Sequence, residues 1–417
     1  MQLKRAVITG LGVVSPVGNS VEEYWKSHQQ GLSGAAEITL FDAAKFKTRF
    51  ACEVKGFDPL DYLDRKEARK MDRFSQFAIA SADQAIADSG FKDSDADLNE
   101  VGVIWGAGIG GMDTFFSEAI NLRENDYNPR FSPFFIPKVI TDIAPGHISI
   151  RHGFRGMNFA TVSACASSTN SLIDALNYIR LGKADIIVAG GSEACVAPSG
   201  VGGFNAMHAL SVRNDDPQTA SRPFDKDRDG FVLGEGGACL IVEELEHALA
   251  RGAKIYAELA GGGLSADAHH LTAPHPEGLG AEKVMERVLS DAGMNPEDVD
   301  YINVHGTSTP LGDVAEVTAI QKVFGEHAYS LNISSTKSMT GHLLGAAGAV
   351  DAMATLLAVT EDLVPPTINH FTDDPALDPK LNFTFENAEK RTVRAAISNT
   401  FGFGGHNASV LFKKFSS

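Results

Sequence analysis

Cys165 stands in a run of small residues, where the sequence pattern changes from strand to helix. Residues 159–163 resemble a short buried strand, and the apolar positions between 172 and 179 recur with the spacing of one helix face. Unpaired N–H groups and the positive end of a helix dipole at that junction favour a thiolate over a thiol. A free cysteine is more often a core residue, but small polar neighbours leave this one uncovered. We therefore interpret Cys165 as a nucleophile.

Two histidines lie at the ends of predicted elements in the second half of the chain. His305 directly follows a predicted strand over 301–304, and His342 is predicted in the first turn of a helix over 343–359, with Thr340 as its N-cap. The positive end of that helix disfavours an imidazolium, so we expect a neutral His342 ring that can donate a hydrogen bond. A single histidine is more often structural, whereas two in such positions favour catalysis.

Two glycine-rich turns raise the alternative of a dinucleotide-binding enzyme. The predicted turn at 10–12 has Ser15 where the third glycine of the motif belongs. The run 106–111 does match G-x-G-x-x-G and follows a predicted strand over 101–105. However, no second strand with an acidic end follows about 20 residues later. A dinucleotide enzyme is therefore the weaker hypothesis.

Metal-binding patterns are incomplete. Residues 225–230 resemble the start of a calcium loop, but Gly236 stands where the bidentate glutamate belongs. His269, His270 and His275 lie in a proline-containing loop without a cluster of partner ligands. We expect no metal site.

A stripe of basic residues is predicted on a helix that begins near residue 64 and whose apolar positions continue to residue 78. Its members recur every three or four residues and are Arg65, Lys66, Arg69, Lys70 and Arg73. Cations in the first turn of a helix oppose its dipole. In a chain of net charge −17, the stripe is therefore better explained by an acidic partner than by a contribution to the fold, with a solvated face as the alternative.

The composition is that of an ordinary globular chain of 417 residues, 43% of them hydrophobic and 21% charged. The four cysteines show no paired spacing, which is typical of a reducing cytoplasm. The net charge of −17 argues against nucleic acid as a general partner. The apolar run near the N-terminus is too short for a signal peptide, and the Ala/Gly-rich stretch 343–359 is interpreted as a buried helix, not as a membrane span.

An internal repeat indicates the architecture. The pattern of 88–105 returns at 291–304, and that of 230–242 returns at 402–412. Two related halves of alternating strands and helices predict a duplicated α/β unit with a shared core. We place the halves at residues 1–252 and 253–417.

At these residues the chain resembles the β-ketoacyl-[acyl-carrier-protein] synthases, a family of condensing enzymes with the thiolase fold. The similarity extends from Val7 to Lys413 and is carried by the stretches 161–168, 225–235, 305–310, 335–347 and 399–407. The resemblance implies a homodimer of five-layered αβαβα subunits. It also implies an acyl thioester on Cys165, with His305 and His342 acting on a malonyl thioester and Lys337 supporting the site. The expected reaction is a decarboxylative condensation that lengthens the acyl chain by two carbons.

The resemblance further implies roles for residues around the site. The substrate-binding positions are Phe403 as a gate, Phe204 beside it, Ile109 and Phe135 at the acyl pocket, Thr307 and Thr309 for the pantetheine arm, and Thr272. The expected docking residues for an acyl carrier protein are Arg65, Lys66, Arg69, Lys70 and Arg130. Substrates would arrive on the phosphopantetheine of that carrier, and no other cofactor is expected. Two positions depart from the family pattern: His208 replaces a common arginine and His406 a usual threonine.

Several alternatives remain at this point. A biosynthetic thiolase would use a second cysteine as base, whereas Cys195 and Cys239 have strand-like surroundings. A cysteine hydrolase would leave Lys337 and the duplication unexplained, and a non-catalytic chain-length subunit would lack Cys165. A polyketide-type ketosynthase stays open, as do the preferred acyl length and the identity of the carrier.

Overall fold

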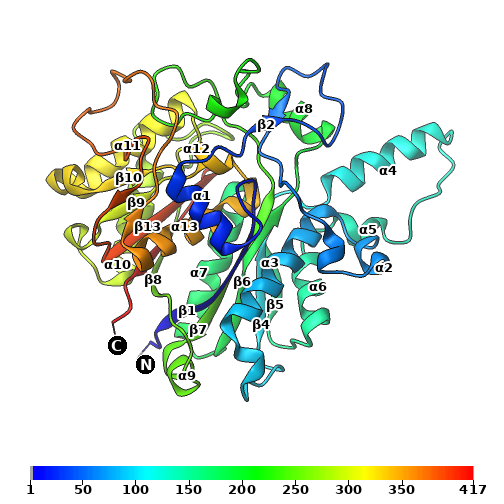
Figure 1. Cartoon of the computed structure of the whole chain (residues 1–417), viewed down its shortest axis with the longest axis horizontal. Helices are drawn as coiled ribbons and strands as arrows, with labels where there is room; N and C mark the ends of the chain where they lie inside the picture. The colour runs from blue at the N-terminus through cyan, green and yellow to red at the C-terminus, as the bar shows by residue number, and fades with distance from the viewer. Residues whose placement is uncertain (1–2, 417) are drawn as a thin grey trace.

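Ten strands follow one another in the order β10-β9-β13-β14-β8-β1-β7-β6-β4-β5 (Figure 1). This computed structural model describes residues 3–416. Five of these ten strands lie in the first half of the chain: β1 (Ala6–Val14), β4 (Gly102–Gly106), β5 (Asn158–Thr161), β6 (Ile186–Glu193) and β7 (Gly236–Glu244). The other five are β8 (Ala257–Ala266), β9 (Tyr301–Asn303), β10 (Asn332–Ser334), β13 (Ala395–Gly402) and β14 (His406–Lys413). Four two-residue strands form separate pairs: β2 (Ala36–Glu37) with β3 (Phe50–Ala51), and β11 (Leu363–Val364) with β12 (Glu389–Lys390).

The two sets of five strands have the same topology. In the first set, β1, β7 and β6 are antiparallel neighbours, whereas β6, β4 and β5 are parallel. The strands β8, β14, β13, β9 and β10 repeat this pattern in the same order. A short pairing of β1 with β8 joins the two sets. The predicted duplication is thus present in the strand order, while the boundary at 252/253 stays a prediction.

Helices form three layers around the two sets of strands. The helices α3 (Arg73–Ser89) and α6 (Ile143–His152) cover one outer face, and α10 (Leu279–Ala292) and α11 (Pro310–Phe324) the other (Figure 1). Between the two sets of strands lie α7 (Ser167–Arg180) and α13 (Ala347–Glu361), each in contact with both sets. Each helix layer has its own buried hydrophobic cluster. The chain is therefore a five-layered αβαβα sandwich with the thiolase-like arrangement.

The central layer explains the long apolar segment of the sequence. Leu344–Glu361 is the one helical segment among residues 3–416 whose length and composition would allow it to cross a membrane. Of this segment, 89% is buried inside the protein, as expected for a core helix that is apolar on all sides.

The strand β1 continues through the glycines that were predicted to form a turn, with an irregularity in its pairing between Ile8 and Gly10. A Cβ atom on Gly12 would lie 2.0 Å from the carbonyl oxygen of Ser81, and one on Gly10 would lie 2.3 Å from that of Ala85. Both oxygens belong to α3. These glycines therefore permit a close helix–strand contact, and the prediction of a turn at 10–12 was wrong.

The predicted basic helix is interrupted. The helix α2 (Arg65–Ala68) ends before α3 begins at Arg73, and Asp72 caps α3 by accepting a hydrogen bond from the Phe74 N–H group. Arg73 does not share the exposed surface, because its Nη2 atom lies 2.7 Å from Oε1 of the buried Glu235. The basic patch therefore consists of Arg65 and Lys66 on α2 and of Arg69 and Lys70 directly after it.

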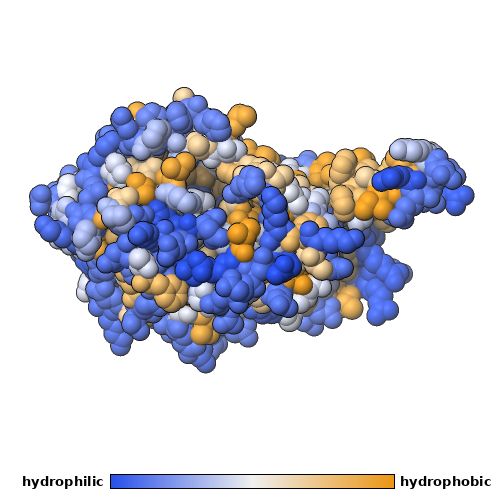
Figure 2. All heavy atoms as spheres, turned by 90° about the horizontal axis from the view of Figure 1, so that it is seen from above, coloured by the Kyte–Doolittle hydropathy of each residue, from blue (hydrophilic) through white to orange (hydrophobic). Residues whose placement is uncertain are grey.

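An arm projects from the body beside this patch. It contains α4 (Met112–Glu124), a loop and α5 (Phe135–Val139), and Figure 2 shows hydrophobic residues along it. Its exposed apolar side chains are Phe115, Ile120, Tyr127, Phe131, Phe134 and Ile136. Such a surface on a folded chain indicates a contact with another molecule. The remaining helices are α1 (Val21–Gln30), α8 (Pro198–Ala206), α9 (Leu245–Ala250) and α12 (Lys337–Thr340).

Candidate active site

Cys165 lies in a single 3-10 turn, Ala164–Ala166, between β5 and the start of α7. The Ser167 hydroxyl accepts a hydrogen bond from the Ser163 N–H group and thereby closes this turn. The Cys165 side chain is 6% exposed and faces a cavity. The predicted strand–turn–helix setting of this cysteine is therefore correct.

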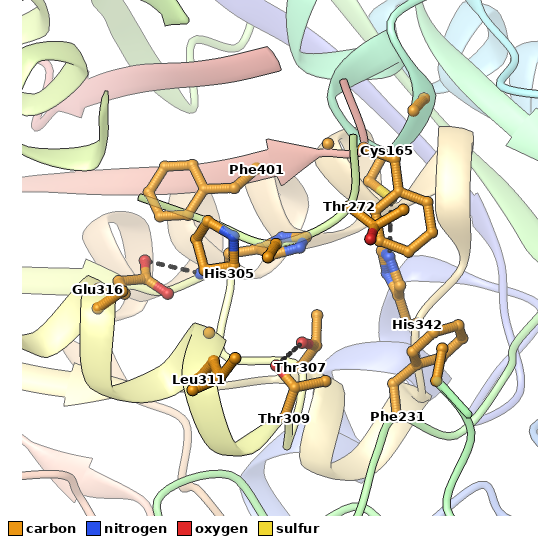
Figure 3. A pocket seen from close by; sticks show the side chains of 18 of the residues that line it. Cys165, Phe231, Thr272, His305, Thr307, Thr309, Leu311, Glu316, His342 and Phe401 are labelled. Carbon is orange, nitrogen blue, oxygen red and sulfur yellow. Dashed lines mark hydrogen bonds between the residues drawn. The ribbon is translucent and has the colours of Figure 1, made fainter. Parts of the chain in front are cut away.

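The structure brings Cys165, His305 and His342 together at this cavity (Figure 3). The Nε2 atom of His342 lies 3.0 Å from the Cys165 sulfur. The His305 ring is nearly perpendicular to that of His342, with 5.2 Å between the ring centroids. Phe231 packs edge-on against His342, and Phe401 packs against His305. A sulfur atom and two imidazoles thus line one partly apolar chamber.

The backbone at His342 differs from the prediction. Thr340 is the last residue of α12, and α13 begins only at Ala347. His342 instead forms a bridge to the neighbouring segment: its N–H group donates to the Val232 carbonyl at 2.7 Å. The helix end that was expected to keep His342 neutral is therefore not at this position.

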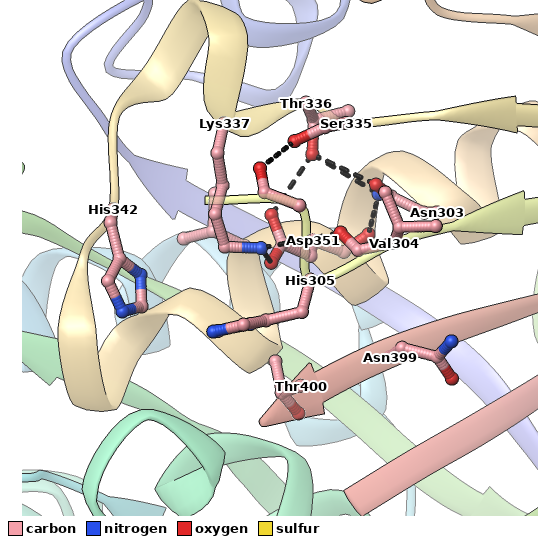
Figure 4. A network of polar contacts seen from close by, with 12 residues as sticks. Asn303, Val304, His305, Ser335, Thr336, Lys337, His342, Asp351, Asn399 and Thr400 are labelled. Carbon is pink, nitrogen blue, oxygen red and sulfur yellow. Dashed lines mark hydrogen bonds and ion pairs between the residues drawn. The ribbon is translucent and has the colours of Figure 1, made fainter. Parts of the chain in front are cut away.

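Burial and a buried lysine keep both imidazoles neutral. Burial lowers the pKa of His342 well below the usual value, and the Lys337 charge adds to this effect. The pKa of His305 is lowered in the same way, by burial first and then by Lys337 and His342. The charge of Lys337 is balanced by Asp351, whose Oδ2 atom lies 2.6 Å from the lysine Nζ atom (Figure 4).

The protonation predicted for Cys165 was wrong. Burial raises the pKa of the thiol to about 12, against smaller opposing effects from the Phe403 N–H group and the Lys337 charge. The first residue of α7 is Ser167, and the desolvation of the sulfur outweighs the nearby helix end. The resting nucleophile is a thiol, hydrogen-bonded to a neutral imidazole.

Glu316 is a site residue that sequence reasoning missed. Its carboxylate accepts hydrogen bonds from the N–H groups of His305 and Gly306, both at 2.9 Å, and from the Asn399 amide at 3.2 Å. Burial raises its pKa to about 7. The only sign of this role in the sequence is an acidic residue between the apolar positions of α11. Glu316 holds the backbone that carries His305.

The cavity has a volume of about 580 Å³, and most of the predicted substrate-binding residues line it. They are Ile109, Phe204, Thr272, Thr307, Thr309 and Phe403. The hydroxyls of Thr307 and Thr309 are 3.1 Å apart, and the Phe204 and Phe403 ring centroids 6.5 Å. His208, one of the two departures from the family pattern, also lines this cavity, whereas His406 lies outside it and is exposed.

Phe135 does not line the cavity of its own chain. It belongs to the arm, where its ring stacks on Phe131 at 5.0 Å and on Phe115 at 6.1 Å. Arg130 is exposed on the same arm. The arm reaches the basic patch through Lys70, whose Nζ atom lies 6.0 Å from the centre of the Phe134 ring.

The glycine-rich loop after β4 is occupied by a side chain of the protein itself. The N–H groups of Gly108, Ile109 and Gly110 all donate to the Glu193 carboxylate. A phosphate would need these same donors. The calcium-like motif is likewise used internally, because Asp225 accepts hydrogen bonds from the Phe371 and Thr372 N–H groups. Among residues 3–416, no group of three or more His, Cys, Asp or Glu side chains is arranged to hold a metal ion.

The chain is similar to known proteins over almost its whole length. Residues 4–248 match the family model of the β-ketoacyl synthase N-terminal domain, and residues 256–371 that of the C-terminal domain. The chain is 48% identical over 415 residues to the 3-oxoacyl-[acyl-carrier-protein] synthase 2 of Synechocystis, covering 100% of this chain and 99% of the relative. It is 49% identical over 414 residues to the protein of the same name from Coxiella burnetii, covering 99% of each.

A solved structure extends this similarity to a complex. It is described as a type II PKS acyl-carrier protein in complex with its ketosynthase bound to the hexaketide. The match has a TM-score of 0.89 at 33% identity and covers 100% of both chains. Because the two family models together match most of its length and the relatives are 48–49% identical to it, the chain belongs to the β-ketoacyl synthase family.

Proposed function

We propose that this chain is a 3-oxoacyl-[acyl-carrier-protein] synthase 2, which condenses an acyl thioester on Cys165 with malonyl-[acyl-carrier-protein]. The observation that carries the proposal is the 3.0 Å contact between the Cys165 sulfur and His342 Nε2, with His305 beside it in the same cavity. The product is two carbons longer than the acyl group that entered, and one CO2 is released.

In the first step, the Cys165 sulfur attacks the thioester carbon of the acyl-carrier. The thiol proton passes to the departing sulfur, so the carrier leaves as a free thiol. The N–H groups of Cys165 and Phe403 both lie close enough to the sulfur to lower its pKa. They are therefore well placed to stabilise the oxyanion that forms on the attacked carbonyl.

In the second step, malonyl-carrier loses CO2 and forms an enolate. Neutral imidazoles of His305 and His342 donate hydrogen bonds to the enolate oxygen, and the buried setting strengthens these bonds. The enolate carbon then attacks the acyl thioester, and Cys165 leaves as a thiolate that is reprotonated. The Cys165 sulfur supplies the electron pair for acyl transfer, and the broken C–CO2 bond of the malonyl group supplies the pair of the enolate. No external oxidant or reductant is needed, so we propose that no metal or redox cofactor takes part.

We propose an acyl carrier protein as the partner that delivers both substrates. A ketosynthase of the same fold has been solved with its carrier protein. The basic patch of this chain offers four cations beside the arm, and complementary charge speeds association with an acidic partner. The phosphopantetheine arm would then pass Thr307 and Thr309 to reach Cys165.

We infer that two copies of the chain form a homodimer through β5. This strand stands at the end of the sheet with β4 as its neighbour, so its outer edge is free to pair with a second copy. The adjacent Val162 is 59% exposed. A partner on this edge would also cover the apolar arm and bring its own Phe135 to the acyl pocket.

A polyketide-type ketosynthase is the second candidate, because the solved complex belongs to that class at 33% identity. A biosynthetic thiolase is disfavoured, since Cys195 and Cys239 are buried outside the cavity and cannot serve as a second base there. We propose a cytoplasmic location, which suits four free cysteines.

Mass spectrometry of the intact protein tests the proposed function. After incubation with an acyl-carrier series from acetyl to dodecanoyl, we expect one acyl group per chain on Cys165 and its release as a product two carbons longer once malonyl-carrier is added. The Cys165→Ala variant is the matched control and should gain no acyl group. An acyl group on another cysteine, or acylation without chain extension, would refute the proposal.

A further inference from the structure

Glu193 is a buried carboxylate behind the cavity that the proposed reaction leaves without a role. It is the last residue of β6 and has no exposed surface. Its Oε2 atom accepts hydrogen bonds from the N–H groups of Gly108 at 2.7 Å and Gly345 at 3.1 Å. Its Oε1 atom accepts from Gly110 at 3.0 Å and Ile109 at 3.2 Å. One side chain thus binds four backbone donors from two separate loops.

The two loops belong to different parts of the active site. The first follows β4 and carries Ile109, which lines the cavity. The second is the 3-10 turn Leu344–Ala346, which begins two residues after His342 and places Leu344 in the same cavity wall. Glu193 therefore holds together the backbone behind the cavity at two points.

Gly108 and Gly345, one in each loop, allow the two loops to approach each other closely. A Cβ atom on Gly345 would lie 2.1 Å from the Gly108 nitrogen, and one on Gly108 would lie 2.7 Å from the Glu193 Oε2 atom. Neither position could carry a larger residue without displacing the other loop or the carboxylate. The glycines thus let the two loops come close enough for one carboxylate, that of Glu193, to bind N–H groups of both.

A purely structural carboxylate would more often be paired with a cation. Within residues 3–416, no Lys, Arg or His lies within ion-pair distance of Glu193. Burial raises its pKa to about 7, and the four N–H groups oppose that effect. A buried carboxyl group held by four backbone N–H groups fixes the position of those donors closely, since losing any one of them leaves a polar group without a partner.

We propose that Glu193 is the positioning residue that sets the acyl length admitted by the cavity, by fixing the loop of Ile109 against the Leu344–Ala346 turn. This inference rests on the proposed function, because it assigns Ile109 to the acyl part of the cavity. Release of the loop would let Ile109 move away from Cys165 and make room for longer chains.

The Glu193→Gln variant tests this role at nearly constant shape. In either orientation the amide NH2 group faces two of the four N–H donors, so the connection between the loops is weakened. We expect the ratio of dodecanoyl to acetyl transfer onto Cys165 to rise about tenfold, equivalent to about 1.4 kcal/mol. Transfer rates would be followed by mass spectrometry of the intact protein.

The matched control is Glu243→Gln. Glu243 is also fully buried, on β7, but it binds Thr9 and Arg251 away from the cavity. This variant should lose stability without a change in the length ratio. If Glu193→Gln also leaves the length ratio unchanged, even where it lowers all transfer rates evenly, Glu193 is only structural and the inference is refuted.

A double variant locates the effect. Ile109→Ala should raise the same ratio, and Glu193→Gln should add little to it in that background. Additive effects would contradict the proposed route through Ile109. Should Glu193→Gln fail to fold, Glu193→Asp keeps the charge but retracts it by one methylene, and an unchanged ratio in that variant would refute the role.

The wild-type protein separates the two proposals. If it forms no acyl adduct on Cys165, the proposed function fails. If adducts form across the series but the variants keep the wild-type length ratio, only the role of Glu193 fails.

Discussion

Cys165 is held as a thiol 3.0 Å from His342, and burial sets the protonation of both groups. The sulfur carries the acyl group and takes no part in the loss of CO2, whereas the imidazoles are needed when the enolate forms. The contributions of these residues to the two half-reactions should therefore be separable.

We expect Cys165→Ala to abolish acyl transfer and condensation while leaving measurable release of CO2 from malonyl-carrier. Replacement of His305 or His342 by alanine should instead lower CO2 release by about 10²–10³-fold, the loss typical of one missing oxyanion donor. Both rates can be measured with labelled malonyl-carrier. Equal loss of CO2 release in all three variants would contradict this separation of roles.

Ile109 offers a second prediction for a single residue. Its side chain lines the cavity, and phenylalanine there would occupy space that a growing acyl chain needs. Overfilling costs about 1–3 kcal/mol, or about one to two orders of magnitude in rate. We expect Ile109→Phe to spare acetyl transfer and to reduce dodecanoyl transfer steeply. A uniform loss across acetyl, hexanoyl and dodecanoyl donors would place Ile109 outside the acyl pocket.

At the scale of elements, the short helix α2 and the turn that follows it carry the basic patch. The break in the helix removes Arg73 from the surface and leaves Arg65, Lys66 and Arg69 exposed, with Lys70 paired to Glu67 at 2.5 Å. The patch is therefore formed by a short helix and the turn after it, not by one face of a long helix.

Charge reversal within the patch tests carrier docking. Lys66→Glu and Arg69→Glu should each slow reaction with carrier-bound substrates about tenfold at low salt and weaken the salt dependence. Short acyl-pantetheine mimics should react at wild-type rates. Lys283→Glu on α10, whose wild-type side chain is 55% exposed, is the matched control. A parallel loss with both kinds of substrate would assign the patch to the fold.

At the scale of the whole molecule, two five-stranded sets share the α7–α13 layer, and β5 ends the row. A second copy that continues the sheet at β5 would bury Val162. We expect Val162→Lys to convert a dimer into monomers and to lower condensation, because the partner's Phe135 would be lost from the pocket. Sedimentation velocity measures the assembly state, and a wild-type monomer would exclude the proposed dimer.

Acid should weaken the fold through His28 on α1. This ring is fully buried, and burial lowers its pKa to about 4. The unfolded chain therefore binds a proton at a higher pH than the folded chain does, and stability falls as the pH drops from about 6.5 to 4. The loss is at most about 3 kcal/mol. Urea unfolding of His28→Leu across this range should show a smaller decline than that of the wild type, and equal declines would exclude His28 as the cause.

The sequence by itself determined the elements around the nucleophile and the repeated topology. The turn at Cys165 is local: a strand, a short turn and an amphipathic helix follow one another within about 20 residues, and periodicity specifies each of them. The equivalence of β4 with β9 and of β7 with β14 was likewise visible, because duplicated units keep their order of strands and turns.

Only the tertiary structure decided how these parts are held and charged. The carboxylates of Glu193 and Glu316 bind N–H groups from loops that other strands bring to them. The true setting of His342 depends on a bridge to Leu233, more than one hundred residues away. The high pKa of Cys165 and the low pKa values of both histidines arise from burial. Burial is a property of packing between distant segments, so no local pattern of residues can specify it.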